Sequence, residues 1–445
     1  MDITNAYVNA LCREKVATTA GPEFGEYEGC VVIIRKALYG LKSSGAAWHA
    51  HLSNNLRVIG FTPSLADPDM WLRNATREDG TEYYEYLVCY VDDLLIVSFK
   101  AKNVIQELRD CGYELKGGEA PETFLGATIG RHTFQDGTST WYQSAEEYLK
   151  NAIKTVEAKL GAPLIPGKVN TPLHPDYHPE VDTTPLLDDD RANYYQSMIG
   201  ILLWASELGR IDITQEVGLM ARFSALPREG HYDAVIRMFC YLKKHLKSRL
   251  VYDTEEKDLT DISFTQCTWE EQYPNAAETL PYNMPKPLGK PVKVTVFCDA
   301  SHADCLVTRR STTGILIFVN GTPIRWYSKR QNTVESSTYG SEFVALRIAT
   351  EMLLALRTSL RMLGVPINGS ADVFCDNNSV VQSSTIPASV LKKKHNAVSF
   401  HKVRETIAAG AMRVSHEPTE SNLADLLSKT TSGPRHRLLT SHILR

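Results

Sequence analysis

The stretch EYYEYLVCYVDDLLIVSF, residues Glu82–Phe99, decides the fold expected for the first part of this 445-residue chain. Two runs of aromatic and β-branched residues flank a polar pair, Asp92 and Asp93. Such runs predict the two strands of a β-hairpin with the acids at its tip. Adjacent carboxylates repel each other unless a cation or solvent compensates them, and magnesium is the usual compensation in phosphate chemistry. A solvated turn is the alternative, because Asp is a common turn residue.

Helical periodicity dominates residues 186–250, where apolar residues recur three and four positions apart. From Glu255 to Pro291 this periodicity is lost and prolines gather, which predicts a connector. Beyond the connector we expect strands, then a long amphipathic helix over roughly 337–364, then a further strand and more helix. The expected strands are Val292–Cys298, Gly314–Val319, Ile324–Tyr327 and, after the long helix, Ala371–Cys375.

Four carboxylates stand at separated positions in this C-terminal region. Asp299 ends the first expected strand, Glu342 opens the long helix, Asp376 ends the later strand, and Asp425 lies in the run Asn422–Asp425. Each alone is expected to be a cap or turn residue. The α/β order of the surrounding elements makes a shared site the competing interpretation.

Composition narrows the class of protein. Hydrophobic residues make up 43% and charged residues 22%, which excludes disordered, collagen-like and coiled-coil chains. No apolar run is long enough to span a membrane, and the nine cysteines form no CxxC pair, so we expect a reduced intracellular compartment. Residues 291–445 carry 19 basic and 11 acidic side chains, which suits a polyanionic partner.

The run Tyr90-Val91-Asp92-Asp93 resembles the YVDD signature of reverse transcriptases, specifically those of copia-type retrotransposon polyproteins. Further stretches match the same family in the same order. They are Met1–Tyr7 (MDITNAY), Lys36–Lys42 (KALYGLK) with Trp48, Phe124–Gly126 (FLG), Tyr195–Gly200 (YQSMIG), and His231, Arg237, Tyr241 and Leu242.

This resemblance implies a polymerase site in the first part of the chain. Asp2 and Asp92 would hold two Mg²⁺ ions, with Mn²⁺ as a substitute, and Asp93 would be the neighbouring carboxylate. Tyr7 falls where the family keeps a barrier to a 2′-hydroxyl, with core packing as the alternative. Gly40 and Lys42 would lie under the nucleotide and template, although a surface lysine is otherwise only a solvated charge.

Two departures from the family bear on this site. Ser43–Ala47 replaces the family's Pro-Arg, which affects template contacts. Only Met1 precedes Asp2, whereas a strand needs about 3 to 6 residues to pair. The sequence therefore predicts an N-terminally truncated palm with the fingers largely missing, whose polymerase activity is in question.

The C-terminal order of elements and the flanks of its acids resemble the ribonuclease H fold. The resemblance implies that Asp299, Glu342, Asp376 and Asp425 converge on two Mg²⁺ ions and let water attack RNA in an RNA–DNA hybrid. It also assigns His416 to product release, with a surface loop histidine as the alternative. Basic residues expected to contact phosphates are Arg309, Arg310, Lys329, Arg330, Lys392, Lys393 and Lys394.

The combined prediction is an α+β palm and thumb followed by an α/β ribonuclease H-like domain. The expected boundaries are palm 1–130, thumb-like helices 131–254, connector 255–290, ribonuclease H-like domain 291–430 and tail 431–445. Expected partners are RNA template, DNA primer, RNA–DNA hybrid, dNTPs and other retrotransposon Pol and Gag products, without a membrane, in cytoplasmic virus-like particles or the nucleus. Two alternatives stay open: a fragment with ribonuclease H activity only, and an inactive transposon relic that binds nucleic acid.

Overall fold

The computed structural model describes residues 1–118, 120–259, 262–391 and 396–445. The chain divides into two compact units that interleave along the sequence. Unit 1 comprises Met1–Leu125, Asn283–Lys290 and Ser359–Val365. Unit 2 comprises Gly126–Tyr282, Pro291–Thr358 and Pro366–Arg445. Among the helices that the structure describes, none combines the length and apolar character needed to cross a membrane.

Unit 1 is built on a six-stranded sheet in the order β4-β5-β6-β7-β1-β8, with helices α2 and α3 supplying apolar side chains to its core. The predicted hairpin is present as β6 and β7, and residues of β6 alternate between buried and partly exposed because one face packs on the core. The short β1 lies between β7 and β8. The elements are β1 Asp2–Ile3, α1 Ala6–Asn9, β2 Ala17–Thr19, η1 Pro22–Tyr27, β3 Val31–Ile33, α2 Ser44–Val58, β4 Thr62–Pro63, β5 Met70–Thr76, β6 Glu82–Tyr90, β7 Asp93–Val97, α3 Ala101–Asp110, β8 Leu115–Lys116 and β9 Thr123–Phe124.

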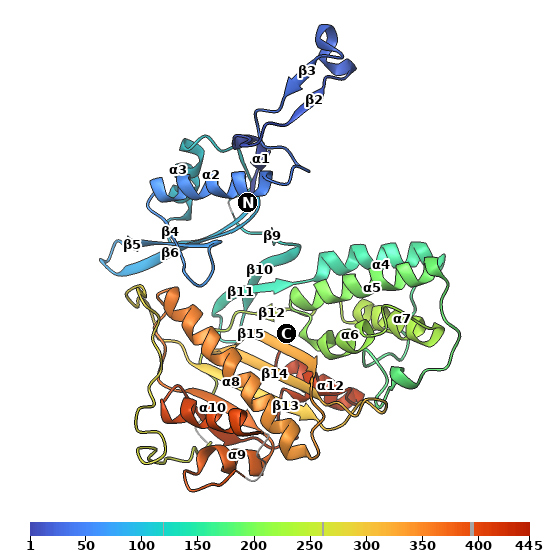
Figure 1. Cartoon of the computed structure of the whole chain (residues 1–445), viewed down its shortest axis with the longest axis vertical. Helices are drawn as coiled ribbons and strands as arrows, with labels where there is room; N and C mark the ends of the chain where they lie inside the picture. The colour runs from blue at the N-terminus through green and yellow to red at the C-terminus, as the bar shows by residue number, and fades with distance from the viewer. Residues whose placement is uncertain (119, 260–261, 392–395) are drawn as a thin grey trace. The chain divides into compact units, whose positions relative to one another are not determined.

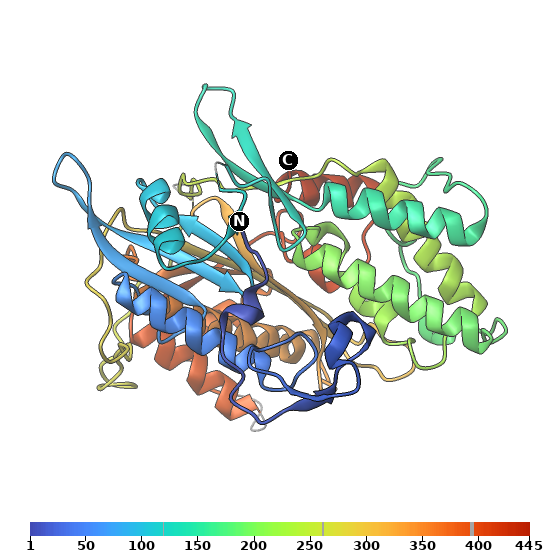
Figure 2. The same ribbon diagram turned by 90° about the horizontal axis from the view of Figure 1, so that it is seen from above.

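The first part of unit 2 is a group of helices with a β-hairpin. The helices α4 to α7, drawn in green shades, lie together in both views (Figure 1, Figure 2) and bury one apolar core. The periodicity over 186–250 is present as α5, α6 and α7, and the Asp188 side chain caps α5 by accepting a hydrogen bond from the Arg191 N–H. The elements are β10 Ala127–Thr133, β11 Ser139–Ser144, α4 Glu146–Leu160, η2 Pro179–Val181, α5 Asp189–Glu207, η3 Ile211–Ile213, α6 Thr214–Ala221, α7 Glu229–Lys244 and β12 Leu250–Val251.

The second part of unit 2 is a mixed five-stranded sheet in the order β15-β14-β13-β16-β17. The strands β13, β14 and β15 pair antiparallel, whereas β16 and β17 run parallel to β13 after the crossover helix α8. Helices α8 and α10 lie side by side (Figure 1). The rings of Phe343 in α8 and Phe400 in α10 stack with their centres 6.2 Å apart. The predicted order of three strands, long helix and strand is confirmed. The elements are β13 Val294–Ser301, β14 Thr312–Val319, β15 Thr322–Arg330, α8 Thr338–Met362, β16 Ala371–Cys375, α9 Asn378–Thr385, α10 Ala397–Ala408, β17 Met412–His416, α11 Asp425–Ser428 and α12 Gly433–Ser441.

The described part of the proline-rich connector contains no helix or strand, yet side chains anchor it. Within unit 2, the Arg357 guanidinium donates to both carboxylate oxygens of Glu278 at 2.7 and 2.8 Å. The guanidinium carbon of Arg404 lies 4.8 Å from the ring centre of Trp269. These contacts hold the connector against α8 and α10.

Candidate active sites

The edge of the unit 2 sheet brings two predicted acids together. Asp299 lies near the end of β13, and Asp376 follows β16 directly. The two strands are parallel neighbours, with Cys298 opposite Cys375, so both acids emerge at the same edge. Asp425 begins α11 and Glu342 lies in the first turns of α8, which places all four carboxylates around one point.

The acids are close enough to share cations. Ligand atoms of Asp299, Asp376 and Asp425 lie within 4.8 Å of one another, as do those of Glu342, Cys375 and Asp376. One oxygen of Glu342, Oε2, is buried and has no hydrogen-bond partner in the described structure. A buried oxygen without a partner is costly, and a divalent cation would satisfy it. The donor set therefore fits Mg²⁺.

Burial and mutual repulsion govern the charge state of these acids. Burial raises the pKa of Asp299 to about 6, and the negative charges of Asp425 and Asp376 add to this against the opposing effect of Lys429. Burial, then the charge of Asp299, holds the pKa of Glu342 well above its usual value. In the absence of a cation, Asp299 and Glu342 therefore hold a proton more tightly than exposed carboxylates do.

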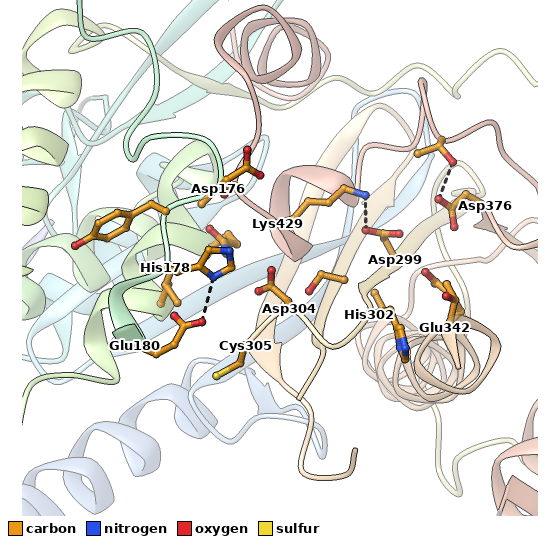
Figure 3. Close-up of a pocket in the computed structure, with 18 of the residues that line it drawn as sticks. Asp176, His178, Glu180, Asp299, His302, Asp304, Cys305, Glu342, Asp376 and Lys429 are labelled. Carbon is orange, nitrogen blue, oxygen red and sulfur yellow. Dashed lines mark hydrogen bonds and ion pairs between the residues drawn. The ribbon is translucent and has the colours of Figure 1, made fainter. Parts of the chain in front are cut away.

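Two basic residues and one hydroxyl that sequence reasoning missed also contact the acids. Lys429 Nζ lies 2.8 Å from Asp425 Oδ1 and 3.6 Å from Asp299 Oδ2, and Figure 3 shows it reaching toward Asp299. Arg435 Nη2 lies 2.8 Å from Asp425 Oδ2. The Ser428 hydroxyl donates to Asp299 Oδ2. The sequence signal was the spacing of Asp425 and Lys429, which are four residues apart.

Asp376 is the least buried acid of the group. The Thr419 hydroxyl donates to its Oδ2 at 2.9 Å. His416, at the end of β17, is hydrogen-bonded through Nε2 to the backbone oxygen of Asp376 at 3.1 Å. The structure thus places His416 beside Asp376 but bonded to its main chain, and the role in product release stays a prediction.

A cavity of about 530 Å³ opens over the acids, wholly within unit 2. One wall carries Asp299, Glu342, Asp376 and Lys429, and Figure 3 shows the opposite wall formed by the segment around His178 and the loop after β13. That wall is tied together at Glu180, whose Oε1 lies 3.1 Å from His178 Nδ1 and accepts the Leu306 N–H at 2.8 Å. Residues expected to form a thumb-like region therefore line this site. The opposite wall includes Asp176, Tyr177, His178, Glu180, Gln215, Arg222, Asp304 and Cys305.

The basic residues predicted to contact phosphates lie outside the cavity lining. Arg309 and Arg310 are in the loop between β13 and β14, and Lys329 and Arg330 end β15. The run Lys392–Lys394 lies outside the described residues. Phosphate binding by this set stays a prediction.

The acids of unit 1 gather around the tip of the β6–β7 hairpin. Asp2 in β1 is the pairing partner of Asp93 in β7, and the Ile3 N–H donates to the backbone oxygen of Asp92 at 2.9 Å. The Tyr39 hydroxyl donates to Asp92 Oδ2 at 3.3 Å. Burial, then the charge of Asp92, raises the pKa of Asp93. Among the described residues, these three acids do not form a group with all ligand atoms within 4.8 Å.

The turn that carries Asp92 is strained. Val91 has φ of 58°, a left-handed conformation that costs a β-branched residue about 1–2 kcal/mol. The Trp48 indole holds the turn by donating to the Val91 oxygen at 2.6 Å. Strain retained at a hairpin tip that presents carboxylates is typical of functional sites.

The other predicted residues of unit 1 surround this tip. Tyr7 is half-buried in α1, and its ring centre lies 4.3 Å from that of Tyr39. Gly40 is exposed with φ of 95°, and Lys42 is exposed two residues before α2 begins at Ser44. Tyr39, which the sequence interpretation did not single out, is the residue that links Tyr7 to Asp92.

Comparison with known proteins shows which proteins the chain is similar to. Residues 1–158 match the family described as reverse transcriptase (RNA-dependent DNA polymerase). Residues 1–158 are thus a reverse transcriptase region, and a ribonuclease H-like fold follows it in unit 2. The chain as a whole is similar to retrotransposon Pol polyproteins of the Ty1/copia type.

Several curated relatives are similar over nearly the whole chain. The Pol polyprotein from transposon RE1 of Arabidopsis thaliana is 24% identical over 97% of the chain, and that from transposon TNT 1-94 of Nicotiana tabacum is 25% identical over 98%. The chain spans only 26% and 30% of these two relatives. A putative transposon Ty5-1 protein of Saccharomyces cerevisiae is 28% identical over 74% of the chain and 92% of its own length.

Solved structures show weaker likeness. LC11 ribonuclease H1 in complex with RNA/DNA hybrid is 19% identical with a TM-score of 0.25, over 31% of this chain and 94% of that chain. The foamy viral protease-reverse transcriptase in complex with RNA/DNA hybrid is 12% identical with a TM-score of 0.29, over 96% and 66%.

Proposed function

We propose that this chain cleaves the RNA strand of RNA–DNA hybrids in unit 2 and copies RNA into DNA in unit 1. The observation that carries the proposal is the convergence of Asp299, Asp376 and Asp425 within 4.8 Å at one sheet edge. Three carboxylates this close repel one another, and a divalent cation bound between them would offset that repulsion.

For hydrolysis, Asp299 and Asp376 would hold both cations, Glu342 one of them and Asp425 the other. Bound magnesium supplies activation of the attacking water and stabilisation of the departing oxygen. The chain itself orients these ligands: the Ser428 hydroxyl fixes Asp299 and the Thr419 hydroxyl fixes Asp376. Burial of Asp299 and Glu342 lowers the local dielectric and strengthens their attraction for a cation.

For polymerisation, Asp2 and Asp92 would hold Mg²⁺ beside Asp93, with dNTPs, an RNA template and a DNA primer as substrates. Tyr7 would exclude a 2′-hydroxyl, and Gly40 and Lys42 would contact nucleotide and template. The basic set on the β13–β14 loop and β15 would contact phosphates of the hybrid. Other Pol and Gag products in a virus-like particle, in the cytoplasm or the nucleus, are the partners that the family suggests.

A second candidate is a chain with ribonuclease H activity only. The observation that favours it is that Asp2, Asp92 and Asp93 are more exposed and less tightly grouped than the unit 2 acids. A chain that binds nucleic acid without turnover is the remaining alternative, and the same experiment separates the three.

The experiment uses the purified chain with Mg²⁺ in two parallel assays, one with a labelled RNA–DNA hybrid and one with a primed RNA template and dNTPs. Asp299→Asn should abolish hybrid cleavage, with Asp136→Asn in the exposed β10–β11 turn as the matched control. Asp92→Asn should abolish primer extension, with Asp79→Asn in the exposed β5–β6 turn as its control. Cleavage without extension would support the second candidate, and binding without either reaction would refute both activities.

A further inference from the structure

Lys429 is a basic residue that forms ion pairs with two of the unit 2 acids. It follows α11 directly, and its backbone N–H donates to the Asp425 oxygen at 3.3 Å, which fixes where its side chain starts. Its ammonium nitrogen then lies 2.8 Å from Asp425 and 3.6 Å from Asp299. Two acids from different elements therefore share one lysine.

Ion pairs with Asp299 and Asp425 hold the side chain of Lys429 in place. Only 37% of its side chain is exposed, so solvent screens these ion pairs less than pairs on an open surface. Its ammonium group pairs with carboxylates of Asp299 and Asp425, so it places a positive charge inside the site.

The lysine and a divalent cation need the same oxygens. Asp425 has its Oδ1 beside Lys429 and its Oδ2 beside Arg435, so both of its oxygens already face positive charge. A cation shared by Asp299, Asp376 and Asp425 would take lone pairs that Lys429 now contacts, and it would repel the ammonium. Binding of one positive group thus opposes binding of the other, and such coupling is reciprocal.

We propose that Lys429 is a built-in cation that competes with divalent metal for Asp299 and Asp425. It holds these acids together when metal is scarce, and it makes metal binding weaker than the carboxylates alone would allow. This inference rests on the proposed function, since it assumes that the acids bind divalent cations.

The test measures binding of Mn²⁺ and Mg²⁺ to the full chain without nucleic acid, by isothermal titration calorimetry and by the metal dependence of the unfolding temperature. Lys429→Met keeps the length of the side chain and removes its charge. We expect it to bind Mn²⁺ roughly 10-fold to 100-fold more tightly than the wild type, a range typical of groups that contact metal ligands. In EDTA the same variant should unfold at a lower temperature than the wild type.

Two further variants complete the design. Lys429→Arg keeps the charge and should bind Mn²⁺ within about threefold of the wild type. Lys247→Met removes the same charge at an exposed site of the same unit and should leave binding unchanged. If Lys429→Met folds only when Mn²⁺ is present, that result also supports the proposal.

Equal Mn²⁺ affinity in the wild type and Lys429→Met, with hybrid cleavage intact, would overturn the competition while leaving the proposed function in place. Weaker binding in Lys429→Met would also overturn it. Failure of every variant and of the wild type to bind divalent cations or cleave hybrid would overturn the proposed site and the inference together.

Discussion

The two acidic sites of this chain hold their carboxylates in opposite ways. In unit 1, Asp92 stands at the tip of a hairpin, partly exposed, and its contact with a side chain is a hydrogen bond from the exposed Tyr39. In unit 2, Asp299 and Asp425 are nearly fully buried, and Lys429 and Arg435 neutralise them. In unit 1 the unfavourable energy lies in the backbone conformation of Val91. In unit 2 it lies in the burial and mutual repulsion of the carboxylates.

This difference predicts how each site responds when one of its carboxylates is replaced. Exposed carboxylates are solvated, so replacing one should change chemistry without changing stability. Buried carboxylates that repel one another destabilise the folded protein, so replacing one should change both. Each prediction below tests this contrast.

The largest effect is expected from Glu342→Gln, which would sharpen the contrast. The amide removes a buried carboxylate whose Oε2 has no partner in the described structure. Hybrid cleavage should fall by about 100-fold or more, as expected when a metal ligand is lost. In EDTA the free energy of unfolding should rise by about 1–3 kcal/mol, because a neutral amide replaces a carboxyl group whose ionised form is disfavoured by burial and by the charge of Asp299.

Asp92→Asn is the matched variant of unit 1, and thermal unfolding of both proteins in EDTA is the measurement. Primer extension should be lost in Asp92→Asn while its unfolding temperature stays that of the wild type. An equal rise in unfolding temperature in both variants would break the contrast between a solvated and a buried site.

Glu216→Gln tests whether burial alone, away from the proposed metal ligands, gives the same signature. Burial raises the pKa of Glu216, in α6, to about 8, with a smaller contribution from Asp212. The folded state therefore keeps a proton that the unfolded state loses above about pH 4.3, and this group makes stability fall as pH rises from about 5 to 8. The fall amounts to about 1.4 kcal/mol per pH unit within that window.

In Glu216→Gln this fall should disappear, so the variant should exceed the wild type most at pH 8 and least at pH 5. Unfolding temperatures across that range, with hybrid cleavage as a second readout, are the measurement. The opposite outcome is a difference in unfolding temperature between the wild type and Glu216→Gln that stays the same from pH 5 to pH 8. That result would show that Glu216 is ionised in the folded protein.

A smaller effect is expected in the strained turn of unit 1. Asn tolerates positive φ far better than Val, so Val91→Asn should stabilise the hairpin by about 1 kcal/mol. Val97→Asn in β7, an exposed position with ordinary strand geometry, is the control and should destabilise it slightly. Hydrogen exchange of the β6–β7 amides reports the difference, and a loss of protection in Val91→Asn would contradict the assignment of strain.

The smallest effect is expected from Tyr39→Phe, which removes the hydroxyl that donates to Asp92. The bond is exposed and 3.3 Å long, so its loss should cost no more than about 0.5 kcal/mol. Amide exchange of Asp92 and Asp93 is the measurement. A cost above 2 kcal/mol would mean that the unit 1 acids are as firmly fixed as those of unit 2, and the contrast would fail.

Local patterns predicted much of this molecule. The apolar runs around Asp92 predicted the β6–β7 hairpin. The turn itself consists of Val91 and Asp92, whereas Asp93 is the first residue of β7. The succession of strands and helix predicted the sheet of unit 2. Asp299 and Asp376 were each predicted at the end of a strand, and the resemblance to the ribonuclease H fold predicted that they converge.

Contacts between segments that are far apart in the sequence could not be predicted from local patterns of residues. Nothing local indicates that Arg435 reaches Asp425, or that the segment around His178 lines the same cavity as Asp299. The expected tail forms α12 and buries Leu439 completely, but nine residues without clear periodicity carry no signal of this. Such features depend on tertiary packing, which neighbouring residues do not encode.

The end of the chain closes unit 2 in a way that bears on how it folds. Arg249 and Arg445 exchange backbone hydrogen bonds of 2.8 and 2.9 Å, and His436 Nε2 is bonded to the backbone oxygen of Asp212 at 3.0 Å. These pairings join segments separated by most of the unit, so they raise its contact order. During synthesis, Ile211 and Leu250 are made long before Leu439, so the apolar cluster that they share can form only after the C-terminal segment has been synthesised.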